Sequence, residues 1–164
     1  MKALIQRVLH AQVWVEGTCV AHLERGLLVY LGVAQGDTKT QAEEIVEKII
    51  HLRVFDDEEG KMNRSLLDIE GAGILWVSQF TLLADCRKGR RPSYSRAAPP
   101  AQAKELYEYT IERSRQYGLP IASGIFQAFM QVQYTNDGPV SILLDTEELE
   151  GLSRRGNWRG KAES

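Results

Sequence analysis

Polar and apolar residues alternate along the beginning of the chain with the two-residue period of β-strands. Residues 2–15 follow this pattern and predict a first strand. Glu16-Gly17 would join it through a hairpin turn to a second strand at residues 19–23. The continuous apolar run at residues 26–33 has the length of a strand that is buried on both faces, so it predicts a central strand.

Helical periodicity separates these strands from the later ones in two places. Apolar residues recur every three to four positions in residues 41–52, where Thr40 and Glu43 have the spacing of a capping box. A second helix is predicted at residues 101–117, because Gly118 and Pro120 follow its last apolar positions and would end it.

The last apolar segments predict strands at residues 131–135 and 140–144, joined by a tight connection at residues 136–139. The sequence turns polar after Asp145, which predicts one domain at residues 1–145 and a loosely ordered tail at residues 146–164. Many strands with two main helices between them predict an α+β fold, with a largely antiparallel sheet curled into a barrel-like core.

One predicted strand contains polar residues that its apolar pattern does not require. Residues 74–83 have the pattern of a strand, yet Ser78, Gln79 and Thr81 interrupt the apolar run. A buried polar group without a partner costs about 1–3 kcal/mol, so a core strand gains nothing from these side chains. They are therefore candidates for a functional site, although a strand with a polar outer face would have the same pattern.

A cluster of cations follows this strand closely. Arg87, Lys88, Arg90 and Arg91 lie near one another, and no acidic residue occurs between Arg87 and Arg96. A cationic loop at the end of a polar strand suits a phosphate-bearing substrate such as RNA. The alternative is a solvated basic loop without a ligand, and composition alone leaves both interpretations open.

Composition narrows the class of protein. A chain of 164 residues with 43% hydrophobic residues can build one domain with a real core. The net charge of −2 argues against a general nucleic-acid coat, so any contact with a polyanion must be local. Cys19 and Cys86 form no CxxC motif and indicate neither a disulfide framework nor a zinc knuckle. Without a signal-peptide core or a membrane-length apolar stretch, the sequence predicts a soluble cytoplasmic protein.

Common catalytic motifs are absent from the sequence. Ser78 lies outside any GxSxG pattern, the 3 histidines are scattered, and there is no Gly-rich phosphate loop. We therefore expect neither a metal nor a cofactor. From the local sequence alone, Arg7 is predicted to be a solvent-facing residue of the first strand. With no conventional base among the candidates, the reactive group must come from the substrate or from water.

Several motifs together closely resemble the D-aminoacyl-tRNA deacylases. The resemblance covers about residues 1–145, and its most specific motifs are SQFTL at 78–82, KGRRPS at 88–93 and NDGPV at 136–140. The opening MKALIQRV and the stretch GKMN are also similar to the family. Ser141 departs from the threonine that is usual there, and Gln127 departs from the usual small residue.

The resemblance implies an editing hydrolase that cleaves the ester of D-aminoacyl-tRNA, and of glycyl-tRNA mischarged on tRNA-Ala, but rejects L-aminoacyl-tRNA. It implies a homodimer in which a cis Gly-Pro peptide projects into the partner subunit's active site. The implied catalytic residues are Ser78, Gln79, Phe80 and Thr81. The implied substrate-binding residues are Gly138, Pro139, Arg7, Leu82 and Met130, with Arg7 bracing the Gly-Pro loop. The predicted tRNA-binding residues are Arg87, Lys88, Arg90 and Arg91.

The sequence alone leaves two questions open, the class of activity and the identity of the nucleophile. The chain could instead be a non-catalytic tRNA- or RNA-binding module, or an esterase for small D-amino-acid esters. Within the deacylase interpretation, Thr81 could act as the nucleophile, but no base adjoins it in the sequence. The alternative, which we favour, is water attack assisted by the substrate's own vicinal hydroxyl, with backbone N–H groups near Phe80 and Thr81 stabilising the oxyanion.

Overall fold

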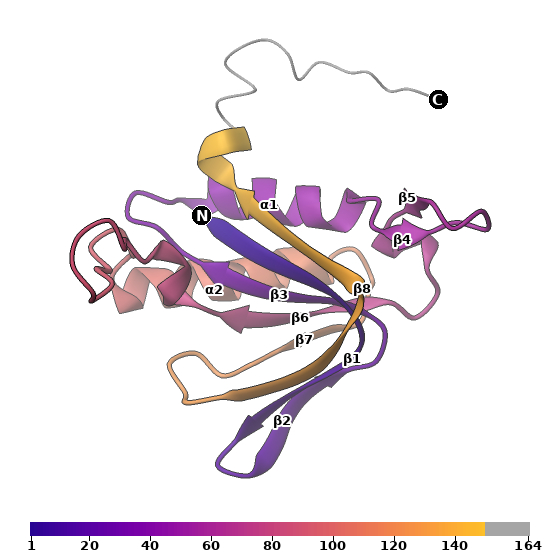
Figure 1. The fold of residues 1–164 in the computed structure, drawn as a ribbon, viewed down its shortest axis with the longest axis horizontal. Helices are drawn as coiled ribbons and strands as arrows, with labels where there is room; N and C mark the ends of the chain where they lie inside the picture. Colours follow the sequence, from indigo (N-terminus) through magenta and orange to yellow (C-terminus); the bar gives the residue numbers. More distant parts are fainter. Residues whose placement is uncertain (150–164) are drawn as a thin grey trace.

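A strongly curled mixed sheet forms the centre of the computed structural model, which describes residues 1–149 (Figure 1). The strands of this sheet are β1 (Lys2–Val15), β2 (Thr18–Leu23), β3 (Gly26–Gly32), β6 (Gly73–Ser78), β7 (Ile121–Ser123) and β8 (Gln131–Asp145). A small separate hairpin consists of β4 (Phe55–Asp56) and β5 (Met62–Arg64). Most of the predicted tail lies outside the described residues; residues 146–149 are helical, and Thr146 is buried.

The long strand β1 organises the sheet. It pairs antiparallel with β3 over its first half, with β2 over its second half, and with β8 along its other edge. Strand β6 pairs parallel with both β3 and β7. Parallel neighbours need a crossover connection, and each of the two main helices lies in one such crossover. The predicted α+β class with a largely antiparallel, barrel-like sheet is confirmed, and the parallel half is a detail that the sequence did not predict.

The central strands are apolar throughout because both of their faces are buried. Leu27, Val29 and Leu31 of β3 contact the main core beneath the helices. Leu28, between them, points to the opposite face, where it joins a second core enclosed by the curled sheet. Strand β6 alternates in the same way, with Trp76 in the main core. Successive side chains of a strand point to opposite faces, so one continuous apolar run serves two cores.

The two main helices, α1 (Lys39–His51) and α2 (Pro100–Arg115), both cover the main core. Helix α1 begins two residues earlier than predicted, because its capping box uses Thr38 and Gln41 rather than Thr40 and Glu43. The Thr38 N–H donates to Gln41 Oε1 at 2.7 Å, which satisfies a group that helix formation leaves unpaired. In the described part of the chain, no helix is both long and apolar enough to cross a membrane.

The structure corrects the predicted strand at residues 74–83. Strand β6 ends at Ser78, and a 3₁₀ helix, η2 (Phe80–Leu83), follows it. Gly32 makes this turn possible, because a Cβ atom there would lie 2.5 Å from Leu83 Cδ2 and 3.0 Å from the Gln79 carbonyl oxygen. The 3₁₀ helix therefore packs directly on the backbone at the end of β3. Periodicity could not predict this stop, since the apolar run continues through Leu82 and Leu83.

The predicted break at residues 136–139 is also corrected. Strand β8 runs without interruption through this segment, and its pairing with β1 shifts register there instead. The Asn136 side chain replaces part of the strand ladder: its Oδ1 accepts the Val140 N–H at 3.0 Å. The segment thus bulges from one continuous strand rather than turning between two strands.

Candidate active site

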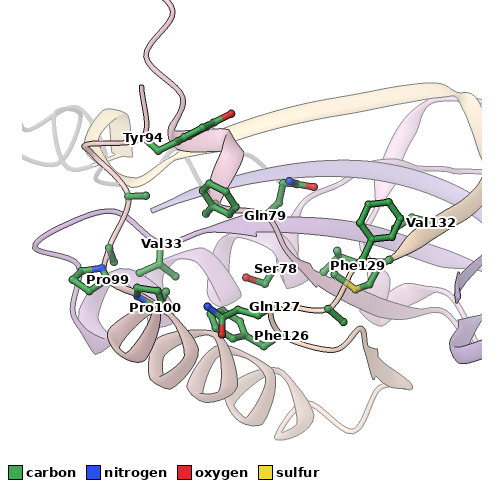
Figure 2. Close-up of a pocket in the computed structure, with 17 residues that line it drawn as sticks. Val33, Ser78, Gln79, Tyr94, Pro99, Pro100, Phe126, Gln127, Phe129 and Val132 are labelled. Atoms are coloured by element: carbon green, nitrogen blue, oxygen red, sulfur yellow. The ribbon is translucent and has the colours of Figure 1, made fainter. Parts of the chain in front are cut away.

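A cavity of about 780 Å³ opens at the end of β6. Three segments that are distant in sequence line most of it: residues 77–80, residues 97–100 with Tyr94, and residues 126–130. Figure 2 shows Tyr94 at one side of this cavity and Phe126 and Gln127 at the other, with Ser78 between them. Of the predicted site residues, the cavity brings together Ser78, Gln79, Phe80 and Met130.

The backbone at the cavity floor is held by bonds from several directions. The Gln79 N–H donates to the Leu31 carbonyl at 2.8 Å, which ties the end of β6 to β3. The Trp76 carbonyl accepts the Tyr107 hydroxyl at 3.0 Å and the Gly124 N–H at 2.8 Å. Burial raises the pKa of Tyr107, so its hydroxyl stays protonated and keeps donating throughout the physiological range. The position of Ser78 is therefore fixed by the fold before any ligand arrives.

The start of the 3₁₀ helix supplies both a hydroxyl and backbone donors. Gln79 Nε2 donates to Thr81 Oγ1 at 2.5 Å, so the amide orients the hydroxyl. The first N–H groups of a helix have no acceptor within that helix, and in η2 these include the N–H groups of Phe80 and Thr81. Thr81 and Leu82 do not line the cavity themselves, and Leu82 instead packs near Gly32.

No acidic, basic, histidine or cysteine side chain is among the described residues that line the cavity. Its polar side chains are hydroxyls from Ser78 and Tyr94 and amides from Gln79 and Gln127. Such groups can donate and accept hydrogen bonds, but they cannot act as a general base at neutral pH. The cavity can therefore orient a polar ligand by hydrogen bonds, but its described lining supplies no general base.

Arg7 and the Gly138-Pro139 peptide form a second cluster. The peptide is cis, and both residues are exposed. Arg7 Nε donates to the Asp137 carbonyl at 2.9 Å, and Nη1 donates to the Val54 carbonyl at 2.8 Å. The interpretation of Arg7 as a solvent-facing residue was wrong, since it is only 8% exposed. Neither residue of the Gly-Pro peptide, nor Arg7, lines the cavity of its own chain.

Ser141, which departs from the usual threonine, still uses its hydroxyl in hydrogen bonds. Ser141 Oγ donates to Gln6 Oε1, and Asn136 Nδ2 donates to the same oxygen at 2.8 Å and to Ser141 Oγ at 3.0 Å. This network links β1 to both ends of the Gly138-Pro139 bulge. A hydroxyl is all that the network requires of residue 141, which explains why serine can replace threonine there.

The departure at Gln127 changes the cavity wall. Its backbone has φ +62°, in the left-handed region that favours glycine and that other residues rarely adopt. Its side chain lines the cavity and makes no hydrogen bond to any other residue of the described chain. The wall therefore carries a free amide at a position whose backbone would suit a residue without a side chain.

The cationic loop protrudes beside the cavity. Asp85 and Ser93 close its base by exchanging two backbone hydrogen bonds of 2.7 and 2.9 Å. Arg87 folds back onto Asp85, with Nη2 2.7 Å from Oδ2, and this hydrogen-bonded guanidinium lowers the pKa of the Asp85 carboxyl well below its usual range. Lys88, Arg90 and Arg91 are exposed and form no ion pair within residues 1–149. Their charges are therefore available to a ligand, whereas that of Arg87 is neutralised locally.

Part of the cavity lining was not predicted from the sequence. Tyr94, Pro99 and Pro100 line it, yet they lie between the cationic cluster and the predicted second helix, where no site residue was expected. Pro99 and Pro100 do indicate the start of a helix, because proline is favoured at the first helical position, which Pro100 occupies in α2. That signal predicts the start of α2, but it does not predict which cavity the prolines face.

The fold and the cavity define an α+β protein with a largely apolar pocket that carries a few hydroxyl and amide groups and lies next to a cationic loop. Residues 4–145 match the family model described as D-Tyr-tRNA(Tyr) deacylase. The chain is 56% identical over 149 residues to the D-aminoacyl-tRNA deacylase of Thermosipho africanus, covering 91% of this chain and 99% of that one. It is 54% identical over 146 residues to that of Geotalea uraniireducens, covering 89% and 94%. The chain belongs to the D-Tyr-tRNA(Tyr) deacylase family, as its motifs predicted.

Solved structures share the fold of this chain. A structure titled c-Myc DNA Unwinding Element Binding Protein has a TM-score of 0.82 and 43% sequence identity, covering 88% of this chain and 98% of its own. A probable eukaryotic D-amino acid tRNA deacylase has a TM-score of 0.74 over the same shares at 18% identity, which shows a common fold.

Proposed function

We infer that this protein is a D-aminoacyl-tRNA deacylase: it hydrolyses the ester between a D-amino acid and the terminal ribose of tRNA, releasing both. Residues 1–145 are the catalytic domain. The observation that carries this proposal is the preformed cavity at the Ser78-Gln79 end of β6, whose lining offers hydrogen-bond groups and no general base. An aminoacyl ester suits such a cavity, because the neighbouring ribose hydroxyl can assist the hydrolysis.

In the proposed reaction, the substrate's vicinal hydroxyl takes part in activating a water molecule that attacks the ester carbonyl. The attacked carbonyl oxygen becomes an oxyanion, and the N–H groups of Phe80 and Thr81 donate hydrogen bonds to it. When the oxyanion collapses, the bond between the carbonyl carbon and the ribose oxygen breaks, and the proton lost by the attacking water ends on that ribose oxygen. Ser78 and Gln79 orient the ester, and Met130 lines the apolar side of the site, while Leu82 lies behind the lining and packs η2 near Gly32. Preorganised donors of this kind accelerate acyl transfer because they require no reorganisation as charge develops.

Selection against L-substrates is proposed to require a homodimer. Gly138 and Pro139 are exposed in the single chain and lie outside its own cavity, so they are free to enter the cavity of a partner subunit. Arg7 holds the Asp137 carbonyl beside them and thereby fixes where the peptide projects. A fixed peptide at that position would collide with the side chain of an L-amino acid. Glycine has no side chain, so glycyl-tRNA mischarged on tRNA-Ala would also be a substrate.

The direct test compares the two enantiomers of one substrate. Purified protein is incubated with D-tyrosyl-tRNA and L-tyrosyl-tRNA, and released tyrosine is measured. We expect release from the D-form at least about a hundredfold faster, the scale set by loss of a well-oriented geometry. Equal rates would leave a non-selective esterase, and no release from either would favour a non-catalytic RNA-binding module. A cytoplasmic location, where charged tRNA is found, is part of the proposal.

Binding of tRNA is proposed to use the cationic loop. Replacing Lys88, Arg90 and Arg91 with alanine should make the negative slope of log binding constant against log salt less steep by about 2, since fewer counterions are released. Arg87→Ala is the matched control: Asp85 already neutralises this cation, so its removal should change the slope less. The measurement is a titration of uncharged tRNA at several salt concentrations. An unchanged slope in the triple variant would remove the loop from the binding surface.

A further inference from the structure

We propose that Tyr94, supported by Phe80, is a stacking platform for an unpaired base of the tRNA 3′ end, immediately before the nucleotide that carries the ester. This inference rests on the proposed function and adds a subsite outside the reaction centre. Tyr94 connects two features that the function uses separately. It lines the cavity, and it directly follows Ser93, which closes the base of the cationic loop.

The Tyr94 ring is exposed although it is a large aromatic group. Its exposed fraction is 39%, and that of its neighbour Phe80 is 55%. The two rings meet edge to face, with centroids 5.0 Å apart and planes at 70°. This contact leaves aromatic surface uncovered at the cavity mouth, and the Tyr94 hydroxyl makes no hydrogen bond to any other described residue. Exposed apolar surface at a cavity mouth is typical of a binding site.

The backbone that carries Tyr94 is fixed on both sides. On one side, Ser93 is bonded to Asp85. On the other side, Gln35 Nε2 donates to the Ser95 carbonyl at 2.7 Å, and the Gln35 N–H donates to the Arg96 carbonyl at 2.8 Å. A surface aromatic held in this way loses little conformational entropy when a ligand stacks on it, which is an advantage for binding. The segment thus has the rigidity of a preformed platform.

The chemistry of the ligand follows from the position between cavity and loop. Unpaired nucleic acid is bound by aromatic rings that stack on bases combined with cations that contact phosphates. Here the exposed ring stands between a cavity that takes the terminal ester and the free cations Lys88, Arg90 and Arg91. A tRNA ends in unpaired CCA, so an RNA strand that enters from the loop places a base beside Tyr94 before its last nucleotide enters the cavity. Stacking tolerates any base and therefore any tRNA.

The test uses substrates of increasing length. The specificity constant kcat/KM is measured for D-tyrosyl-adenosine, which reaches only the cavity, and for D-tyrosyl-CCA, which also reaches the platform. Tyr94→Leu keeps an apolar side chain but removes the ring. We expect it to lower kcat/KM for D-tyrosyl-CCA by about 5- to 100-fold more than it lowers kcat/KM for D-tyrosyl-adenosine, the usual range for one stacked base. Tyr94→Phe keeps the ring and should keep the wild-type ratio of kcat/KM between the two substrates.

Parallel measurements separate this proposal from the proposed function. Binding of the uncharged CCA trinucleotide and of adenosine is measured with the same variants, so stacking is tested even if no ester is cleaved. A weaker affinity of Tyr94→Leu for CCA alone supports the platform. Equal losses with adenosine and CCA would show that Tyr94 only shapes the cavity, and no loss with either would remove it from the RNA path. A change in oligomeric state without a selective loss for CCA would assign the ring to a subunit contact. Each of these last three results overturns the proposal.

Discussion

Hydrolysis of D-tyrosyl-tRNA should slow by about a hundredfold or more when the terminal adenosine is replaced by 2′-deoxyadenosine carrying the amino acid on its 3′ oxygen, because general acid–base assistance contributes on this scale. The described residues that line the cavity include no side chain that could act as a base at neutral pH. In the proposed reaction the vicinal hydroxyl assists the attack of water, so its removal should slow the reaction directly. Single-turnover release of D-tyrosine from the two substrates measures the difference.

The matched protein variant is Thr81→Ala. The Thr81 hydroxyl accepts a hydrogen bond from Gln79 Nε2 at 2.5 Å and lies outside the cavity lining. If the substrate assists its own hydrolysis, Thr81→Ala should retain activity within about tenfold of wild type, since it loses an orienting contact and not the reactive group. Thr81→Ser restores the hydroxyl and should recover the loss. An inactive Thr81→Ala with a normal rate on the deoxy substrate would instead define a threonine hydrolase.

Sequence pattern predicted the fold well where one period dominates a segment. Residues 2–15 alternate and form β1, and the apolar run that begins at Gly26 forms β3. It failed where a contact between distant residues overrides the period. Leu82 and Leu83 continue the apolar run of β6, yet the chain turns into a 3₁₀ helix because Gly32 allows it to pack on the β3 backbone. That contact joins residues distant in the chain, so no local pattern contains it.

The candidate site was predicted only in part, again because contacts between residues distant in the chain build the rest of it. Ser78 and Gln79 were recognised as polar residues that a core strand does not need, and they do line the cavity. The other walls come from Tyr94, in the connection between β6 and α2, and from residues 126–130, which follow β7. The environment of Arg7 was also hidden: its burial depends on Val54 and Asp137, far away in sequence. Tertiary contacts of this kind decide burial, and a single sequence does not display them.

Gly138→Ala should reduce D-tyrosyl-tRNA hydrolysis by at least about a hundredfold, because a small displacement of a positioning group can cost that much. Gly138 has φ +131°, which L side chains rarely adopt. An added Cβ would lie 2.9 Å from Val140 Cγ2 and 3.1 Å from Arg7 Nη2, so the bulge must shift away from the guanidinium that holds it. Gly71→Ala is the matched control: its φ is +75°, but nothing lies within 4 Å of the added Cβ. It should leave activity close to wild type.

Subunit mixing shows whether that loss arises across a dimer interface. Gly138 does not line the cavity of its own chain, whereas Gln79 does. Gly138→Ala and Gln79→Ala, each expected to be nearly inactive, are unfolded together at equal concentrations and refolded as a mixture. A mixed dimer contains one site built from an unaltered cavity and an unaltered Gly-Pro peptide, so about a quarter of all sites should work if the contact is isologous. Activity that stays at the level of the separate variants would place the Gly-Pro peptide outside the partner's site, because a cavity complete within one chain cannot be restored by mixing.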